Sequence, residues 1–131
     1  MSTPVTVVPL LVFEAADCLM AVVACEVGHL EKRFRDPFSD VAGENGSRNH
    51  FDLGEYFAGR ESDGPWLQWA RGSRRAWLRV RRVVDVVPVS IKGLTPMPAP
   101  LRAQARTCAF LAAGVSGDDV FLLLDPARLV H

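Results

Sequence analysis

The sequence has little that would cross-link a small protein or anchor it in a membrane. Its three cysteines, Cys18, Cys25 and Cys108, are odd in number and show no CxxC spacing, so neither a disulfide framework nor a zinc site is expected. No apolar run approaches the ~20 residues that span a bilayer. The N-terminal stretch lacks a positive start, and Glu14 and Asp17 interrupt it, which argues against a signal peptide. We therefore expect a cytoplasmic protein without direct membrane insertion.

The sequence also lacks the common motifs of enzymes, namely GxGxxG, GxxxxGK[ST], HExxH and GxSxG. Cys25 and His29 have the spacing of a nucleophile–base pair only on a helix, and no third group orients them. Cys25, His29 and His50 match no metal-ligand spacing. The adjacent Asp118 and Asp119 are typical of a hairpin tip rather than of an acid–base pair. The prediction is a non-enzymatic protein with no metal and no cofactor.

Net charge is zero, but the charges are unevenly distributed. Residues 71–106 contain nine basic residues and one acidic residue, whereas the rest of the chain contains six basic and fourteen acidic residues. This segment could present a positive face to an acidic partner. The alternative is that these arginines are solvated strand residues, balanced by acids that lie nearby in space.

A nucleic-acid-binding β-barrel is the prediction of another class that the sequence leaves open. Six arginines lie within twelve residues, near three tryptophans, and such an arrangement on strands can bind single strands by charge and stacking. The tryptophans lie in apolar runs that a small core needs, and the balanced net charge also argues against this function. We therefore do not expect nucleic acid as a partner. The residues concerned are Trp66, Trp69, Trp77, Arg71, Arg74, Arg75, Arg79, Arg81 and Arg82.

Short apolar runs separated by Gly and Pro predict an all-β protein with only short helical turns, formed as one domain over residues 1–131. Residues 7–14 and 18–25 are predicted to be two antiparallel strands that turn at 15–17 and are buried on both faces. Residues 33–49 are predicted to be a loop, and 50–57 a strand end followed by a helical turn. Strands are also expected at 66–70, 77–89, 108–115 and 120–124, with a bulge or bend near Arg81 and Arg82. Asp125 and Pro126 are predicted to start a last helical turn.

Five segments, in this order, resemble those of CheW-like chemotaxis coupling proteins. They are LVF followed by CLMAVVACEVGHL, then FDL, then WLRVRRVVDVVPV, then LTPMP, and last FLAAGVSGDDVFLLLDPARLV. The last segment is the most specific match, and together the segments cover nearly the whole chain. The resemblance implies two small β-barrel lobes around a shared core, and an adaptor that connects chemoreceptors to a histidine kinase.

The resemblance also implies where partners bind. In this family the cytoplasmic receptor tip lies in a groove between the lobes. Val27 and Leu30, at the end of the second predicted strand, and Val86 and Val87 correspond to that groove. An apolar groove that accepts a helical tip is a known mode of recognition. The alternative is that these four residues belong to the ordinary core.

Two departures from the family pattern concern partner binding. The interval between Arg33 and His50 lacks the family's glycine- and arginine-containing motif and is about ten residues short, roughly one strand with its turn. We therefore expect a truncated first lobe, similar to that of FrzB-like accessory proteins of the myxobacterial Frz system. Arg48 corresponds weakly to the arginine of the motif, and Arg81 and Arg82 replace a frequent Asp-Gly. These three arginines are candidate partner contacts.

The resulting prediction is an unequal adaptor. It binds the cytoplasmic tip of methyl-accepting chemoreceptors and other CheW-like proteins, and it couples weakly or not at all to a CheA-type histidine kinase. The alternative within the family is a full receptor–kinase coupling protein.

Overall fold

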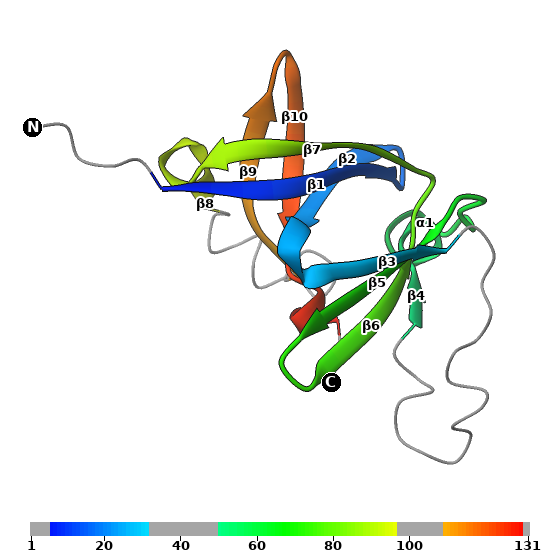
Figure 1. Ribbon diagram of the computed structural model, residues 1–131. Helices are drawn as coiled ribbons and strands as arrows, with labels where there is room; N and C mark the ends of the chain where they lie inside the picture. Colours follow the sequence, from blue (N-terminus) through cyan, green and yellow to red (C-terminus); the bar gives the residue numbers. More distant parts are fainter. Residues whose placement is uncertain (1–5, 32–49, 97–108, 130–131) are drawn as a thin grey trace, which may run out of the picture.

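The computed structural model describes residues 6–31, 50–96 and 109–129 as two β-sheets with only short helices (Figure 1). The larger sheet has the strand order β7-β1-β2-β10-β9-β8, and the smaller sheet has the order β3-β5-β6-β4. The larger sheet contains β1 (Val7–Ala15), β2 (Cys18–Val23), β7 (Arg82–Ser90), β8 (Thr95–Pro96), β9 (Phe110–Ser116) and β10 (Asp119–Leu124). The smaller sheet contains β3 (Val27–Glu31), β4 (His50–Asp52), β5 (Trp66–Arg71) and β6 (Arg74–Arg79). The helices are η1 (Ala24–Glu26), α1 (Leu53–Ala58), η4 (Ile91–Gly93) and η5 (Pro126–Arg128).

Within the described residues, two-residue turns join three of the antiparallel strand pairs. Ala16 and Asp17 connect β1 to β2, and both have positive φ, at 52° and 61°. The turns β5–β6 and β9–β10 begin with Gly72 and Gly117, each at φ 61°. Such turns match the right-handed twist of the paired strands. The predicted hairpins at 7–25 and 108–124 are confirmed, and the loop of the second hairpin is two residues long.

The second predicted strand is shorter than expected, because β2 ends at Val23 and η1 follows. In the register of the β1–β2 pair, Leu10 lies opposite Val23, so the next pair would set Ala24 against Pro9. Proline has no N–H to donate to the ladder. The chain leaves the larger sheet at this point and enters the smaller one as β3, which pairs with β5.

A second change of sheet occurs between β6 and β7, at the predicted bend. The N–H of Val80 donates to the Pro65 carbonyl at 3.0 Å, and the N–H of Arg81 donates to the Glu14 carbonyl at 2.8 Å. Gly64 packs against this crossover so closely that a Cβ there would lie 1.9 Å from the Arg81 carbonyl oxygen. The bend near Arg81 is therefore the passage from one sheet to the other.

Two apolar cores explain why β1 is buried on both faces. Leu11 and Phe13 point into a core shared by the two sheets, which also contains Trp69 and Leu78 of the smaller sheet. Leu10 and Val12 point the other way, into an inner core built from strands of the larger sheet and including Phe121. Successive side chains of a strand alternate between faces, so one apolar run serves both cores. The predicted all-β fold is confirmed, and its two sheets share a core.

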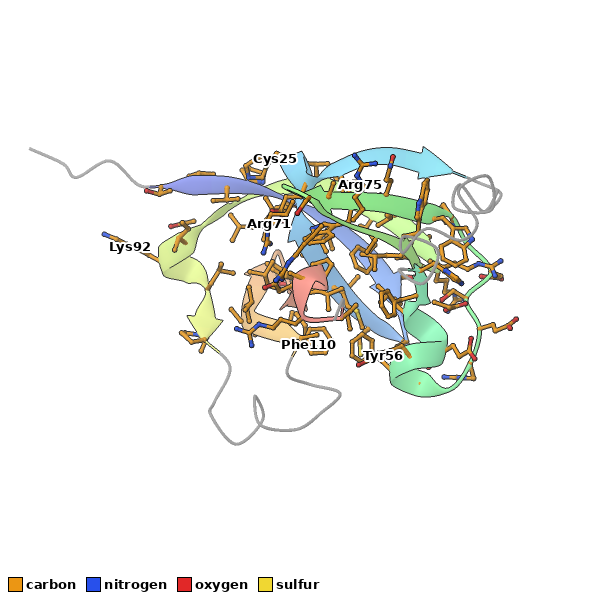
Figure 2. The ribbon with its side chains drawn as sticks, turned by 90° about the horizontal axis from the view of Figure 1, so that it is seen from below. Cys25, Tyr56, Arg71, Arg75, Lys92 and Phe110 are labelled. Atoms are coloured by element: carbon orange, nitrogen blue, oxygen red, sulfur yellow. The ribbon has the colours of Figure 1, made fainter. Side chains whose placement is uncertain are left out.

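Two of the short helices, α1 and η5, correspond to the predicted helical turns. The Asp52 carboxylate caps α1 by accepting from the N–H of Glu55 at 3.2 Å, and Gly59 ends the helix at φ 72°. Phe57 of α1 stacks on Phe110 of β9 with ring centroids 4.9 Å apart. Figure 2 shows the neighbouring Tyr56 and Phe110 on the same side of the molecule. The Asp125 side chain accepts from the N–H of Ala127 at 3.2 Å, so the predicted last turn is confirmed.

Candidate functional site

Val86 lies at the rim of the shared core. On the edge strand β7 it pairs with Leu11 of β1, which in turn pairs with Val22 of β2. Directly paired side chains share a face of the sheet, so the three form one row. Exposure in this row is 0% for Val22, 9% for Leu11 and 50% for Val86. The apolar face of the shared core thus continues outward to an uncovered valine.

Val87 does not share that face, which corrects the expectation that Val86 and Val87 line one groove. Val87 pairs with Leu10 and packs against the inner core of the larger sheet. Neighbouring residues of a regular strand point to opposite faces, so only one of the two valines can border a groove next to the shared core.

Val27 and Leu30 also have a different position from the one expected. Both belong to β3, in the smaller sheet, rather than to the end of the second strand. Val27 pairs with Trp69 and is partly buried against the shared core. Leu30 pairs with Leu67 in the backbone register, and its side chain lies outside the described residues. Val27 and Val86 thus border the same core from different sheets.

The sequence did not single out Val84, which is 44% exposed on β7. The β1–β7 register shifts between Val12 and Phe13, whose partners are Asp85 and Val83. Val84 is the extra residue of this β-bulge, and bulges redirect side chains at sheet edges. We call Val84 and Val86 the β7 strip. In the sequence, residues 83–89 do not alternate between apolar and polar side chains, and this irregularity could have indicated the β7 strip.

The three candidate arginines have different environments. Arg82 forms two hydrogen bonds of 2.8 Å with the Glu14 carboxylate on the adjacent strand. This bond is the main cause that lowers the pKa of Glu14 below its ordinary range. Arg81 is exposed, and Arg48 lies outside the described residues. Arg81 and Arg82 are both exposed, but Arg82 is paired with Glu14 within the protein.

Two small clefts of about 260 and 230 Å³ share Asp17 and Arg81 in their lining. They lie beside the β1–β2 turn, and the larger cleft also borders the segment that follows α1. An ion pair between Asp17 and Arg60 links the turn to that segment. Within the described ranges, no group of three His, Cys, Asp or Glu residues could hold a metal ion. Among the described carboxylates, Glu14 and Glu26 have a clearly lowered pKa, and arginine partners favour their ionised forms.

The arginine-rich hairpin β5–β6 is partly neutralised from within the protein. Arg71 binds the Glu26 carboxylate at 2.5 and 3.0 Å and the Asp125 carboxylate at 3.1 Å. Arg74 and Arg75 remain exposed at the hairpin tip. The three tryptophans of this region are buried, and buried rings cannot stack on nucleotide bases. These observations weaken the nucleic-acid alternative and support the balanced-charge interpretation.

The two sheets, the shared core and the inner core define a CheW-like fold. Among solved structures, the chain is similar to the scaffolding protein TtCheW from Thermoanaerobacter tengcongensis, with a TM-score of 0.67 and 16% identity over 91% of this chain and 89% of that chain. No protein-family model and no curated protein sequence matches the chain. The two coverages are nearly equal, so this comparison does not confirm a shortened first lobe. No helix in the described part of the chain is long and apolar enough to cross a membrane.

Proposed function

We propose that the protein is a non-enzymatic, single-domain adaptor of a bacterial chemosensory system, which binds the cytoplasmic tips of chemoreceptors and is recruited to their clusters in the cytoplasm. The observation that carries this proposal is the half-exposed Val86, which continues the apolar row of the shared core to the edge of a CheW-like fold. The structurally similar TtCheW is described as a scaffolding protein. A fold hosts many functions, so the exposed strip carries the argument for docking.

The form of the β7 strip suits a helical partner. Val84 and Val86 expose apolar side chains on an edge strand, and Val27 borders the same core from β3. An amphipathic helix presents apolar side chains at positions three and four apart, which can seat along such a surface. The resemblance to coupling proteins implies a helical hairpin at the receptor tip as this partner.

The first test is Val86→Asp, measured against a purified chemoreceptor hairpin from the same gene cluster. Docking would desolvate the new carboxylate at a cost of several kcal/mol, so affinity should fall by more than tenfold. Val115→Asp is the matched control, because Val115 is a still more exposed valine of the larger sheet, on the β9–β10 hairpin. Both variants should keep the wild-type circular dichroism spectrum. Equal receptor affinity for Val86→Asp and Val115→Asp would remove the docking surface from the proposal.

Val27→Arg and Leu30→Asp extend the test to the smaller sheet. If β3 forms the second side of the groove, both variants should remain folded and lose receptor affinity. Unfolding of Val27→Arg, whose wild-type side chain is partly buried against the shared core, would assign that residue to the core alone. Thermal unfolding monitored by circular dichroism separates the two results.

The proposal includes weak or absent coupling to a CheA-type kinase. Its support is the interval between Arg33 and His50, which lacks the glycine- and arginine-containing motif of coupling proteins. A lost strand and turn would remove part of an interface that ordinarily needs ~800 Å² on each partner. If kinase coupling is weak, the protein has an accessory, FrzB-like role. The alternative is a full receptor–kinase coupling protein.

A side-by-side titration tests the coupling. The purified protein and a full-length coupling protein are titrated against the same kinase and the same receptor hairpin. We expect comparable receptor affinities and a kinase affinity at least tenfold weaker for this protein. Grafting the full-length segment between Arg33 and His50 should restore kinase binding. Kinase binding as tight as that of the full-length protein, without the graft, contradicts weak coupling and favours the full coupling protein.

A further inference from the structure

The outer edge of β7 has an unusual backbone pattern. Pro9 of β1 and Pro88 of β7 lie directly opposite each other, and neither has an N–H, so this pair cannot exchange ladder hydrogen bonds. Hydrogen-bonded and non-bonded pairs alternate along an antiparallel ladder. Residues 86 and 88 therefore direct their backbone polar groups away from β1. The 3.2 Å bond from the Ile91 N–H to the Thr6 carbonyl agrees with this alternation, because residue 91 faces inward.

Neither of these two outward positions offers a free donor. The N–H of Val86 donates to the Asp85 Oδ1 at 2.7 Å, and Pro88 has no N–H. An added β-strand needs alternating donors and acceptors along the edge. In the middle of β7, an approaching strand would meet two carbonyl groups and no donor. No strand within the described ranges pairs with this edge.

We propose that Asp85 and Pro88 determine the specificity of the β7 strip, closing it to β-strands while leaving Val84 and Val86 accessible to a helix. This inference rests on the proposed function and specifies the kind of partner structure that the strip accepts. An open edge strand with exposed valines is a template for pairing with another chain, including a second copy of this one. A helix makes no backbone bonds to its partner, so the closed edge costs it nothing.

The side-chain chemistry at position 85 offers a matched series. Aspartate is short enough for its carboxylate to reach the N–H of the following residue, as observed. Asparagine keeps a side-chain carbonyl at the same distance and removes the charge. Alanine removes the acceptor and frees the Val86 N–H. The comparison of Asp85→Asn with Asp85→Ala therefore separates the hydrogen bond from the charge.

The experiment is sedimentation of the full chain from micromolar to millimolar concentration. We expect the double variant Asp85→Ala/Pro88→Val to self-associate at least tenfold more tightly than the wild type. The matched variant Asp85→Asn/Pro88→Val, which keeps the acceptor for the Val86 N–H, should associate less tightly than the alanine variant. Hydrogen exchange should show the Val86 N–H protected in the associated form. Adding Val86→Pro removes one of the two outward donors that the double variant frees, and should reduce the gain.

Three results would overturn the inference. They are a folded alanine double variant that associates no more than the wild type, an equal gain in Asp85→Asn/Pro88→Val, and a gain that Val86→Pro does not reduce. If the double variant does not fold, the single variant Pro88→Val provides the same comparison. None of these measurements involves the receptor. A wild-type protein that fails to bind the receptor hairpin would therefore contradict the proposed function. It would not change the result of the self-association experiment on the β7 edge.

Discussion

At the scale of single residues, the β1–β2 turn contains a conformation that its sequence does not favour. Ala16 and Asp17 both adopt the left-handed region, at φ 52° and 61°. Asn and Gly are the usual residues at such positions, and a left-handed alanine costs roughly 1–2 kcal/mol. Burial of the flanking strands must offset this cost, because Phe13 and Met20 on either side are fully buried in the shared core.

We expect Ala16→Asn to raise the free energy of unfolding by about 0.5–1 kcal/mol, because asparagine tolerates the left-handed region. The side chain has room, since Ala16 lines the larger cleft. Urea denaturation gives the comparison. Ala58→Asn is the control, because Ala58 is exposed at the end of α1 with negative φ, and asparagine should be neutral or unfavourable there. A loss of stability in Ala16→Asn would show that the turn is not strained.

At the scale of elements, the crossover from β6 to β7 depends on a close backbone approach. The segment 59–65 crosses Val80 and Arg81 without a side chain between them, because Gly64 has no Cβ. This contact and the bond from the Arg81 N–H to the Glu14 carbonyl fix the direction in which β7 leaves the crossover. The placement of the β7 strip beside β1 follows from it.

Gly64→Ala should therefore destabilise the protein by about 1–3 kcal/mol, the usual cost of forcing an extra carbon into a filled site. The added Cβ would lie 1.9 Å from the Arg81 carbonyl oxygen, and that backbone must move. Gly93→Ala is the matched control, because a Cβ there meets nothing within 4 Å. Thermal unfolding of both variants tests the prediction. Equal stability of the two alanine variants would mean that the crossover is not constrained by Gly64.

At the scale of the whole molecule, Arg71 joins parts that are distant in the sequence. It extends from β5 of the smaller sheet and binds Glu26 in η1, where the chain passes between the sheets. It also binds Asp125, which follows β10 of the larger sheet, and its guanidinium lies 5.3 Å from the centre of the Trp69 ring. Figure 2 shows Arg71 among these elements. The Arg71 side chain thus connects the smaller sheet to the end of β10 in the larger sheet.

Arg71→Ala should lower the free energy of unfolding by about 1–2 kcal/mol, since two mostly buried carboxylates lose a charged partner while Arg71 itself is partly solvated. Arg75→Ala is the control, because Arg75 is exposed on the same hairpin and its loss should be nearly neutral. Chemical denaturation measures both. If the two substitutions lower the free energy of unfolding by similar amounts, Arg71 does not connect the two sheets in the proposed way.

The same connection predicts a dependence on pH. The hydrogen bond from Arg71 is the main cause that lowers the pKa of Glu26, with a further contribution from Trp69 and an opposing effect of burial. A carboxylate whose pKa is lower in the folded state stabilises the fold above its unfolded pKa of about 4.3, and this contribution is lost as the pH falls through the folded pKa. The difference in stability between wild type and Arg71→Ala should therefore shrink as the pH falls below the unfolded pKa and through the lowered folded pKa of Glu26. If the stability difference does not change with pH, the contribution of Arg71 comes from its packing on Trp69 rather than from the ion pair with Glu26.

Most local structure could be predicted from the sequence because it depends on local physics. Apolar runs broken by Gly and Pro determined the strands, and Asp125 with Pro126 determined the start of η5. The same reasoning gave the β1–β2 hairpin, although its turn residues are not those that such turns prefer. The resemblance of the whole chain to coupling proteins gave the two-lobed arrangement, which periodicity alone could not supply.

The tertiary structure alone decided which side chains share a face. Val86 and Val87 are adjacent valines in the sequence. Pairing with Leu11 places Val86, half exposed, on the face of the shared core, whereas pairing with Leu10 directs Val87 to the inner core. Val27 moved to the other sheet because Pro9 ends the ladder that β2 would have continued. The exposure of Val84 arises from a register shift between strands about 70 positions apart. Such pairings depend on contacts between distant segments, and a strand's own pattern does not contain its partner's register.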